Sequence, residues 1–273
     1  MTTIPLAGST AAPVRTRLWR EAAILAGRTI RHWRARPAAF AVQLLFPVLV
    51  ILMMGGLLGG AIAGSAGNYI LFVIPGVLAF TMLFGVETTM IAVTTDAAKT
   101  VTDRFRSMPI SRGSVLLGRV LADMLTSVVE VVVITLAGLA LGWRWENGVL
   151  PALAAYGLLL WLRFGLLWVG VWAGLTVGSP EAVSAAQLLA WPIGFLSTVF
   201  VQPVTMPVWL GAIAEANPLS ATATAVRELF AGVHQPGLTW AAAHPLVIAL
   251  AAPLLLTAVF GPLAVRAFKG LGR

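Results

Sequence analysis

Long apolar runs alternate with short polar segments along the whole chain. Most of the runs reach the roughly 20 residues that an α-helix needs to cross the hydrocarbon core of a bilayer. We therefore predict an all-α integral membrane protein with six transmembrane helices. The predicted spans are 38–63, 69–94, 114–141, 151–177, 182–201 and 241–265. They form a transmembrane domain of residues 38–267, between a tail of residues 1–37 and a short tail of residues 268–273.

Residues 206–232 interrupt this pattern just before the last span. They contain two amphipathic stretches, separated by Asn217 and Pro218, that are too short and too polar to cross a bilayer. We expect short helices on the extracytoplasmic side, lying on the membrane face or re-entering it.

Composition agrees with a membrane protein. Hydrophobic residues make up 59% of the chain and charged residues only 10%, with a mean hydropathy of +0.92. A soluble domain carries roughly 25% charged residues. The chain has no cysteine, which excludes disulfides and thiolate metal sites. The net charge of +8 would suggest a nucleic-acid partner in a soluble protein. Here we expect none, because the basic residues are concentrated in segments between and beyond the predicted spans.

The distribution of basic residues predicts the orientation. Most of the 18 Lys and Arg residues lie in the first tail, in segment 96–119 and in the last tail. By the positive-inside rule, both termini and segment 96–112 are then on the cytoplasmic side of the cell membrane. The arginines of residues 15–36 also suit an amphipathic helix lying among the lipid headgroups.

Segment 96–112 is a charged island between the second and third predicted spans. Asp96 can cap the start of a short helix over 96–109, and Pro109 disfavours its continuation. Val101, Phe105 and Met108 recur at i, i+4 and i+7 and form one apolar stripe. This pattern has two interpretations: a helix that transmits force from a cytoplasmic partner, or a solvated loop that holds positive-inside charges.

Several kinds of chemistry are missing from the sequence. Neither of its two lysines completes a GxxxxGK[ST] phosphate loop, and its three histidines show no metal-ligand spacing. There is also no GxSxG nucleophile elbow. We therefore expect no catalytic residue, no bound metal and no cofactor. Active transport would draw its energy from another chain or from an ion gradient.

Charged residues inside the predicted spans are the candidate functional residues. A charge in the bilayer core is expensive, so each should face protein or water and have a partner. Asp123 lies one helical turn from Arg119, which predicts a local ion pair. Glu130 and Arg163, on adjacent spans, either pair with each other or line a polar substrate pathway. Glu87 is a further candidate for that pathway.

Two motifs resemble those of type 2 ABC-transporter permeases, including the daunorubicin-resistance-like and nodulation-export-like subunits. Residues 103–112 resemble the family's D/E-x-x-x-R-x-R-S-x-P-I-S-R pattern between spans two and three, although the Thr-Val-Thr-Asp stretch that ends at Asp103 lacks the glycine that the family often has there. Residues 191–220 resemble a second signature, with Gln202 and Pro203 shifting one expected proline by a position. The matching residues are Pro192, Phe195, Leu196, Ser197, Phe200, Val201, Met206, Pro207, Trp209, Leu210, Ala214, Asn217 and Pro218, followed by Arg227.

The resemblance implies an exporter subunit, and apolar spans with few buried charges favour a hydrophobic or amphipathic drug, antibiotic or lipid over a sugar chain as its substrate. It also implies a homodimer or heterodimer of permeases, which binds two copies of a separate ATPase that uses ATP and Mg. The implied ATPase-coupling residues are Asp103, Arg104, Phe105, Arg106, Met108 and Pro109, and the implied extracytoplasmic gate motif is Met206, Pro207, Trp209, Asn217 and Pro218. The alternative is a gradient-driven secondary transporter, which normally shows inverted repeats that we do not find here.

Overall fold

The computed structural model describes residues 27, 37–64, 66–98, 112–232, 237 and 239–270. All regular secondary structure in these residues is helical, which confirms the predicted class. The elements are α2 (Pro37–Ile51), the π-helical η1 (Leu52–Leu58), α3 (Gly59–Ala63), α4 (Ala66–Ala98), α6 (Arg112–Ala140), α7 (Val149–Thr176), α8 (Pro180–Phe195), the 3₁₀ turn η2 (Pro203–Thr205), α9 (Val208–Ala216), α10 (Pro218–Ala231), α11 (Trp240–Ala243) and α12 (Pro245–Gly270).

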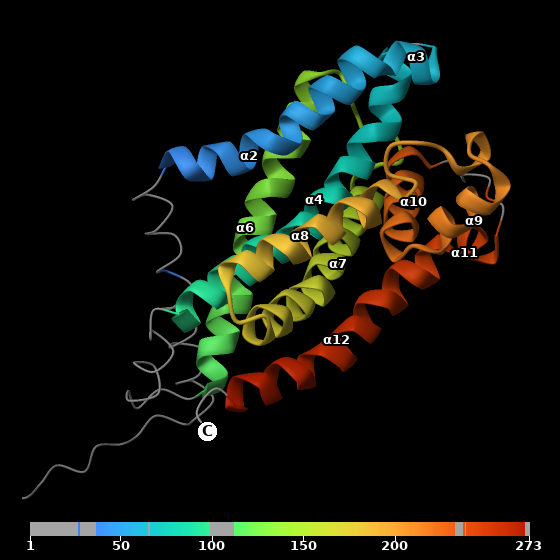
Figure 1. Ribbon diagram of the computed structural model, residues 1–273. Helices are drawn as coiled ribbons and strands as arrows, with labels where there is room; N and C mark the ends of the chain where they lie inside the picture. Colours follow the sequence, from blue (N-terminus) through green and yellow to red (C-terminus); the bar gives the residue numbers. More distant parts are fainter. Residues whose placement is uncertain are drawn as a thin grey trace, which may run out of the picture.

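Helix α4 is the centre of the bundle (Figure 1). In the apolar part of α4 that could cross the membrane, 78% is buried inside the protein, against 17% for Phe40–Ala61, which runs from α2 into α3, and 17% for α12. Helix α7 packs along α4, and α12 packs along α7, whereas α2 lies on the other side of α4 (Figure 1). The apolar side chains of α2 and α12 therefore remain available to lipid or to another chain.

Five helices of the described residues are long and apolar enough to cross a membrane. They are Phe40–Ala61, Tyr69–Asp96, Leu116–Ala140, Val149–Thr176 and Pro245–Phe268. The predicted fifth span, 182–201, corresponds to α8, which has only 16 residues and ends at Phe195. At 1.5 Å per residue it is about 24 Å long, shorter than a hydrocarbon core of about 30 Å. The six-span count and the re-entrant placement of the short helices therefore stay predictions.

Two predicted helix boundaries are corrected by the structure. Asp96 was expected to cap a new helix, but α4 continues through it to Ala98, because no Pro or Gly interrupts the chain there. The predicted last span, 241–265, is divided at His244, which has a non-helical backbone, so that α11 and α12 are separate. The cause is Pro245, since a residue before proline is disfavoured in helical geometry.

The short helices α9, α10 and α11 gather at one end of the bundle (Figure 1). The α6–α7 loop lies at the same end, because the backbone amides of Glu146 and Asn147 donate to the carbonyl oxygen of Phe230 in α10, at 2.8 and 3.1 Å. The ring of Trp143 packs edge-on against Phe230, with 5.0 Å between ring centroids. These contacts join the α6–α7 loop to α10 at that end of the bundle.

Helices α7 and α12 approach closely at Gly165. A Cβ at this position would lie 2.7 Å from the Cα and 2.8 Å from the carbonyl oxygen of Pro253, so the α12 backbone would have to move. We expect Gly165→Ala to lower the free energy of unfolding by about 1–3 kcal/mol, measured by SDS titration in detergent. Gly157→Ala is the matched control, because no atom lies within 4 Å of its Cβ position. Equal stability of the two variants would contradict this packing.

Candidate functional site

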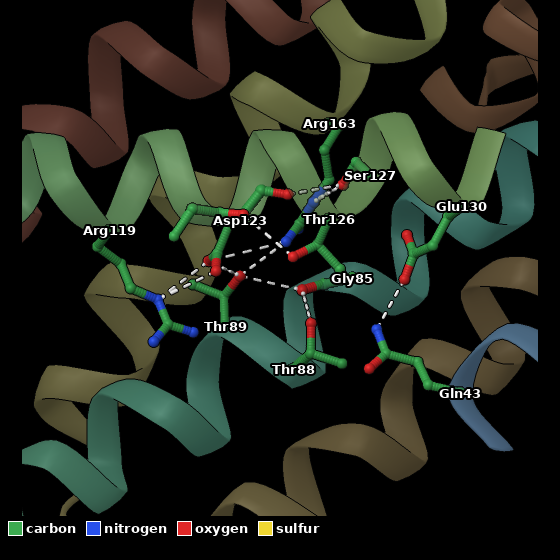
Figure 2. Close-up of polar contacts among 11 residues, drawn as sticks. Gln43, Gly85, Thr88, Thr89, Arg119, Asp123, Thr126, Ser127, Glu130 and Arg163 are labelled. Atoms are coloured by element: carbon green, nitrogen blue, oxygen red, sulfur yellow. Dashed lines mark hydrogen bonds and ion pairs between the residues drawn. The ribbon is translucent and has the colours of Figure 1, made fainter. Parts of the chain in front are cut away.

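Arg163 of α7 lies at the centre of a polar network inside the helical bundle (Figure 2). Only 2% of this residue is exposed, and its guanidinium lies between α4 and α6. Its Nε donates to Ser127 Oγ at 3.1 Å, and its Nη2 donates to Thr89 Oγ1 at 2.8 Å. Nη2 is also 3.9 Å from Asp123 Oδ2. One cation therefore connects three membrane-spanning helices.

Asp123 is the carboxylate of this network. Thr89 Oγ1 donates to Asp123 Oδ2 at 2.7 Å, and Arg119 Nε lies 3.2 Å from both carboxylate oxygens. The predicted Arg119–Asp123 pair is thus confirmed. The alternative in which Glu130 pairs directly with Arg163 is wrong, because the guanidinium is turned toward Asp123 and the hydroxyls of α4 and α6 (Figure 2). The side chains of Asp123 and Arg163 come close because both point into the space between α4, α6 and α7 (Figure 2).

Gly85 makes room for this arrangement. A Cβ on Gly85 would lie 2.6 Å from the guanidinium carbon of Arg163, so any larger residue would displace the cation. Helices α4 and α7 also come close at Gly170, where a Cβ would lie 3.0 Å from the carbonyl oxygen of Val86. Gly85 therefore leaves space for the Arg163 side chain, and Gly170 lets the two backbones approach, as is common between membrane helices.

Glu130 belongs to a second polar contact on α6. It is 5% exposed, and its Oε1 accepts a hydrogen bond from Nε2 of Gln43 in α2 at 2.7 Å (Figure 2). This bond joins the peripheral helix α2 to the bundle.

The sequence did not predict the role of Gln43, and it did not predict the roles of the hydroxyls of Thr89 and Ser127. The available signal for Gln43 was a lone amide within an apolar run, because a polar group in the bilayer needs a partner.

Glu87 and Glu130 line one cavity of about 270 Å³ between α2, α4, α6 and α8. Most of the remaining wall is apolar and carries four large rings, those of Phe46, Phe80, Phe84 and Trp191. The rings contact one another, with centroids 4.6 Å apart for Phe80 and Phe84 and 4.8 Å apart for Phe84 and Trp191. The structure therefore brings Glu87 and Glu130 together at a cavity and places Arg163 behind it, on the far side of Gly85.

The predicted extracytoplasmic gate motif extends from the residues before α9 to the first residue of α10. Asn217 caps α10 by accepting from the amide of Leu219 at 2.9 Å, and its Nδ2 donates to the carbonyl oxygens of Ile193 and Leu196 at 2.8 and 3.0 Å. It thus joins the end of α8 to the start of α10, where Pro218 takes the first helical position. Met206 and Pro207 precede α9, and Trp209 is 67% exposed on that helix.

Arg227 of α10 ties the motif to the bundle. Its Nε donates to the carbonyl oxygen of Phe72 at 2.9 Å, and its Nη2 donates to that of Val199 at 2.8 Å. The guanidinium carbon lies 3.7 Å from the centroid of the Phe72 ring, a cation–π contact. Burial lowers the pKa of Arg227 to about 9, so it still carries its charge at neutral pH.

The expected ATPase-coupling residues lie outside the described residues. They are Asp103, Arg104, Phe105, Arg106, Met108 and Pro109. The arginine-rich segment 15–36 also lies outside them, apart from Gly27. Residues 99–111, which contain the predicted coupling residues, lie in sequence between Ala98 of α4 and Arg112 of α6, the two helices that carry Thr89 and Asp123.

Taken together, the long apolar helices and the polar groups buried between them define a multi-span membrane protein with a polar interior. Residues 20–231 match the family model described as ABC-2 type transporter, and the chain belongs to this family. It is 37% identical over 249 residues to the daunorubicin resistance ABC transporter permease protein DrrB1 of Streptomyces coeruleorubidus, covering 88% of this chain and 86% of that protein. It is 26% identical over 218 residues to the putative transport permease ycf38 of Pyropia yezoensis, covering 78% and 74%. This chain is therefore a permease-type membrane subunit of an ABC transporter.

Proposed function

We propose that this chain is the membrane-spanning half of an ATP-driven exporter. It moves a hydrophobic or amphipathic molecule, such as a drug or antibiotic, out across the cytoplasmic membrane. A dimer of permease chains binds two copies of a separate ATPase, which holds ATP and Mg and carries out hydrolysis. The observation that carries the proposal is the ABC-2 family match over residues 20–231, which includes the charged segment between α4 and α6.

Two further observations support it. Residues 1–273 contain no phosphate-binding loop, which supports ATP binding by a separate ATPase. A similar permease is named for daunorubicin resistance, which favours a small organic molecule as the transported substrate.

The position of the polar network suggests how movement is transmitted. Thr89 lies nine residues before Ala98, or about 14 Å along α4, and Asp123 lies eleven residues after Arg112, or about 17 Å along α6. A shift of the coupling segment by the ATPase moves both helices. It therefore acts on the Thr89–Asp123–Arg163 contacts, which have to rearrange if α4 and α6 separate. Alternating access follows as a change between two packings of these helices.

The test is ATP hydrolysis by the permease purified together with its ATPase. We expect Phe105→Ala/Arg106→Ala to lower permease-dependent hydrolysis about tenfold or more, because it removes one aromatic and one cationic side chain of the coupling segment. The matched control is Arg144→Ala/Trp240→Ala, which removes an exposed aromatic residue and an exposed arginine at the opposite end of the bundle. This control should retain wild-type activity.

Two results would contradict the proposal. If no ATPase associates with the purified wild-type chain, the energy source is not ATP and a gradient-driven carrier becomes the better hypothesis. If the coupling variant assembles and hydrolyses ATP like the wild type, segment 96–112 is a solvated loop.

A further inference from the structure

The aromatic cavity beside the polar network combines two kinds of wall. On α4, Phe80, Phe84 and Glu87 follow one another at i, i+4 and i+7, which puts them on one face of the helix. Trp191 of α8 and Phe46 of α2 complete the aromatic side, with 6.2 Å between their ring centroids at an interplanar angle of 89°. The carboxyl groups of Glu87 and Glu130 form the acidic side.

No described residue supplies a cation to the acidic side of the cavity. Among the described residues that line it there are two carboxyl groups and no Lys, Arg or His. Glu130 is bonded to a neutral amide, that of Gln43. Glu87 forms no hydrogen bond or ion pair with any described residue. The nearest buried cation, Arg163, points its guanidinium at Asp123, Ser127 and Thr89 instead.

This combination indicates what the cavity accepts. An acidic group within a membrane span is unfavourable unless something of opposite charge neutralises it. The faces of aromatic rings attract cations, and their area binds apolar groups. A hard metal ion would need six or more oxygen ligands, whereas most of this wall is carbon. An organic cation with an aromatic body matches both walls at once.

We propose that this cavity is a substrate site for aromatic organic cations, with Glu87 as the charge-recognising residue, Glu130 as a second acidic contact, and Phe46, Phe84 and Trp191 as the aromatic contacts. The proposal deepens the exporter function above and rests on it, because it names the substrate class of that transporter. Gln43 holds Glu130 at the cavity wall and joins α2 to the site, so a bound cation also links α2 to α4.

The experiment measures binding of tritiated tetraphenylphosphonium, an aromatic cation without titratable protons, to the full chain purified with its ATPase. Binding of tetraphenylborate, which has the same shape and the opposite charge, is measured in a separate sample, because the two ions precipitate each other as a salt. We expect the wild type to bind the cation much more tightly than tetraphenylborate. Glu87→Gln preserves the size of the side chain and removes its charge, and it should weaken binding about tenfold or more. Phe46→Leu keeps an apolar side chain but removes a ring, and it should weaken binding about fivefold.

The matched control is Glu146→Gln, the same change on an exposed residue of the α6–α7 loop, which should bind the cation like the wild type. The proposal is overturned if the wild type does not bind tetraphenylphosphonium, if Glu87→Gln and Phe46→Leu both bind it with wild-type affinity, or if the wild type binds tetraphenylborate equally well. The last result would indicate a neutral lipid-like site without charge recognition.

The two proposals can fail separately. If ATP hydrolysis by the complex depends on Phe105 and Arg106 but the affinity for the cation does not depend on Glu87, only the proposed substrate site is wrong. If no ATPase associates and the chain alone binds the cation through Glu87, the site stands and the energy source is wrong.

Discussion

Asp123→Asn is expected to lower the free energy of unfolding by about 3–5 kcal/mol, because it leaves a buried cation without its counter-charge. Asp123 is the carboxylate within 4 Å of Arg163, at 3.9 Å. The Arg163 guanidinium is 2% exposed, and its Nη1 already has no hydrogen-bond partner among the described residues. It therefore cannot recover the lost interaction from water. The measurement is SDS titration of the purified protein in detergent, followed by circular dichroism.

The double variant Asp123→Asn/Arg163→Met separates the charge effect from general damage. Removing both charges of a buried pair is often close to neutral, so we expect it to recover most of the lost stability. The hydroxyls stay satisfied, because Thr89 Oγ1 also lies 3.1 Å from the carbonyl oxygen of Gly85 and Ser127 Oγ donates to that of Asp123 at 3.1 Å. A double variant as unstable as Asp123→Asn would show that the pair is not the source of the effect. Glu146→Gln, on the surface, is the control.

Arg227→Met is expected to have the second largest effect. It removes two hydrogen bonds from a charged donor to the carbonyl oxygens of Phe72 and Val199, each contributing about 1.5–3 kcal/mol. It also removes the cation from the face of the Phe72 ring. Because these contacts hold α10 against α4 and against residues 196–201, we expect the short helices to detach before the rest of the bundle. Limited proteolysis of α9 to α11 would detect this as faster cleavage.

Arg227→Lys tests whether the geometry or the charge of the guanidinium matters. A single ammonium group cannot donate to two separate carbonyl oxygens in the planar arrangement that arginine provides, so most of the protection should still be lost. Arg266→Met is the control, because Arg266 is exposed near the end of α12. If both Arg227 variants were cleaved at the same rate as the wild type, α10 would be held by its apolar contacts alone.

Much of the fold could be predicted from the pattern of apolar residues. The α6 and α7 spans were predicted within a few residues of their ends, because they are long apolar runs bounded by Gly or polar residues. Helix α8 was predicted too long. Residues 196–201 are apolar enough to continue it, but the carbonyl oxygens of Ile193 and Leu196 bond to Asn217 instead. These hydrogen bonds join residues more than 20 positions apart, so they cannot be predicted from a local sequence pattern.

The candidate site was predicted only in part. Glu87, Glu130 and Arg163 were recognisable because charges are rare in membrane spans. Their partners were not, except for Arg119 and Asp123, which are one turn apart on the same helix. The partners of Arg163 lie 36 and 74 positions away along the chain, so they depend on how α4, α6 and α7 are rotated against one another.

The sequence by itself determined that this protein is a helical membrane protein, where most of its long apolar helices lie, and which family it resembles. These properties follow from the cost of exposing polar backbone and side chains to lipid, which acts on each segment separately. Only the tertiary structure decided that Arg163 meets Asp123 rather than Glu130, and that Glu87 and Glu130 share an aromatic cavity. Those outcomes depend on close packing at glycines such as Gly85, where a single methyl group would change which side chains can meet.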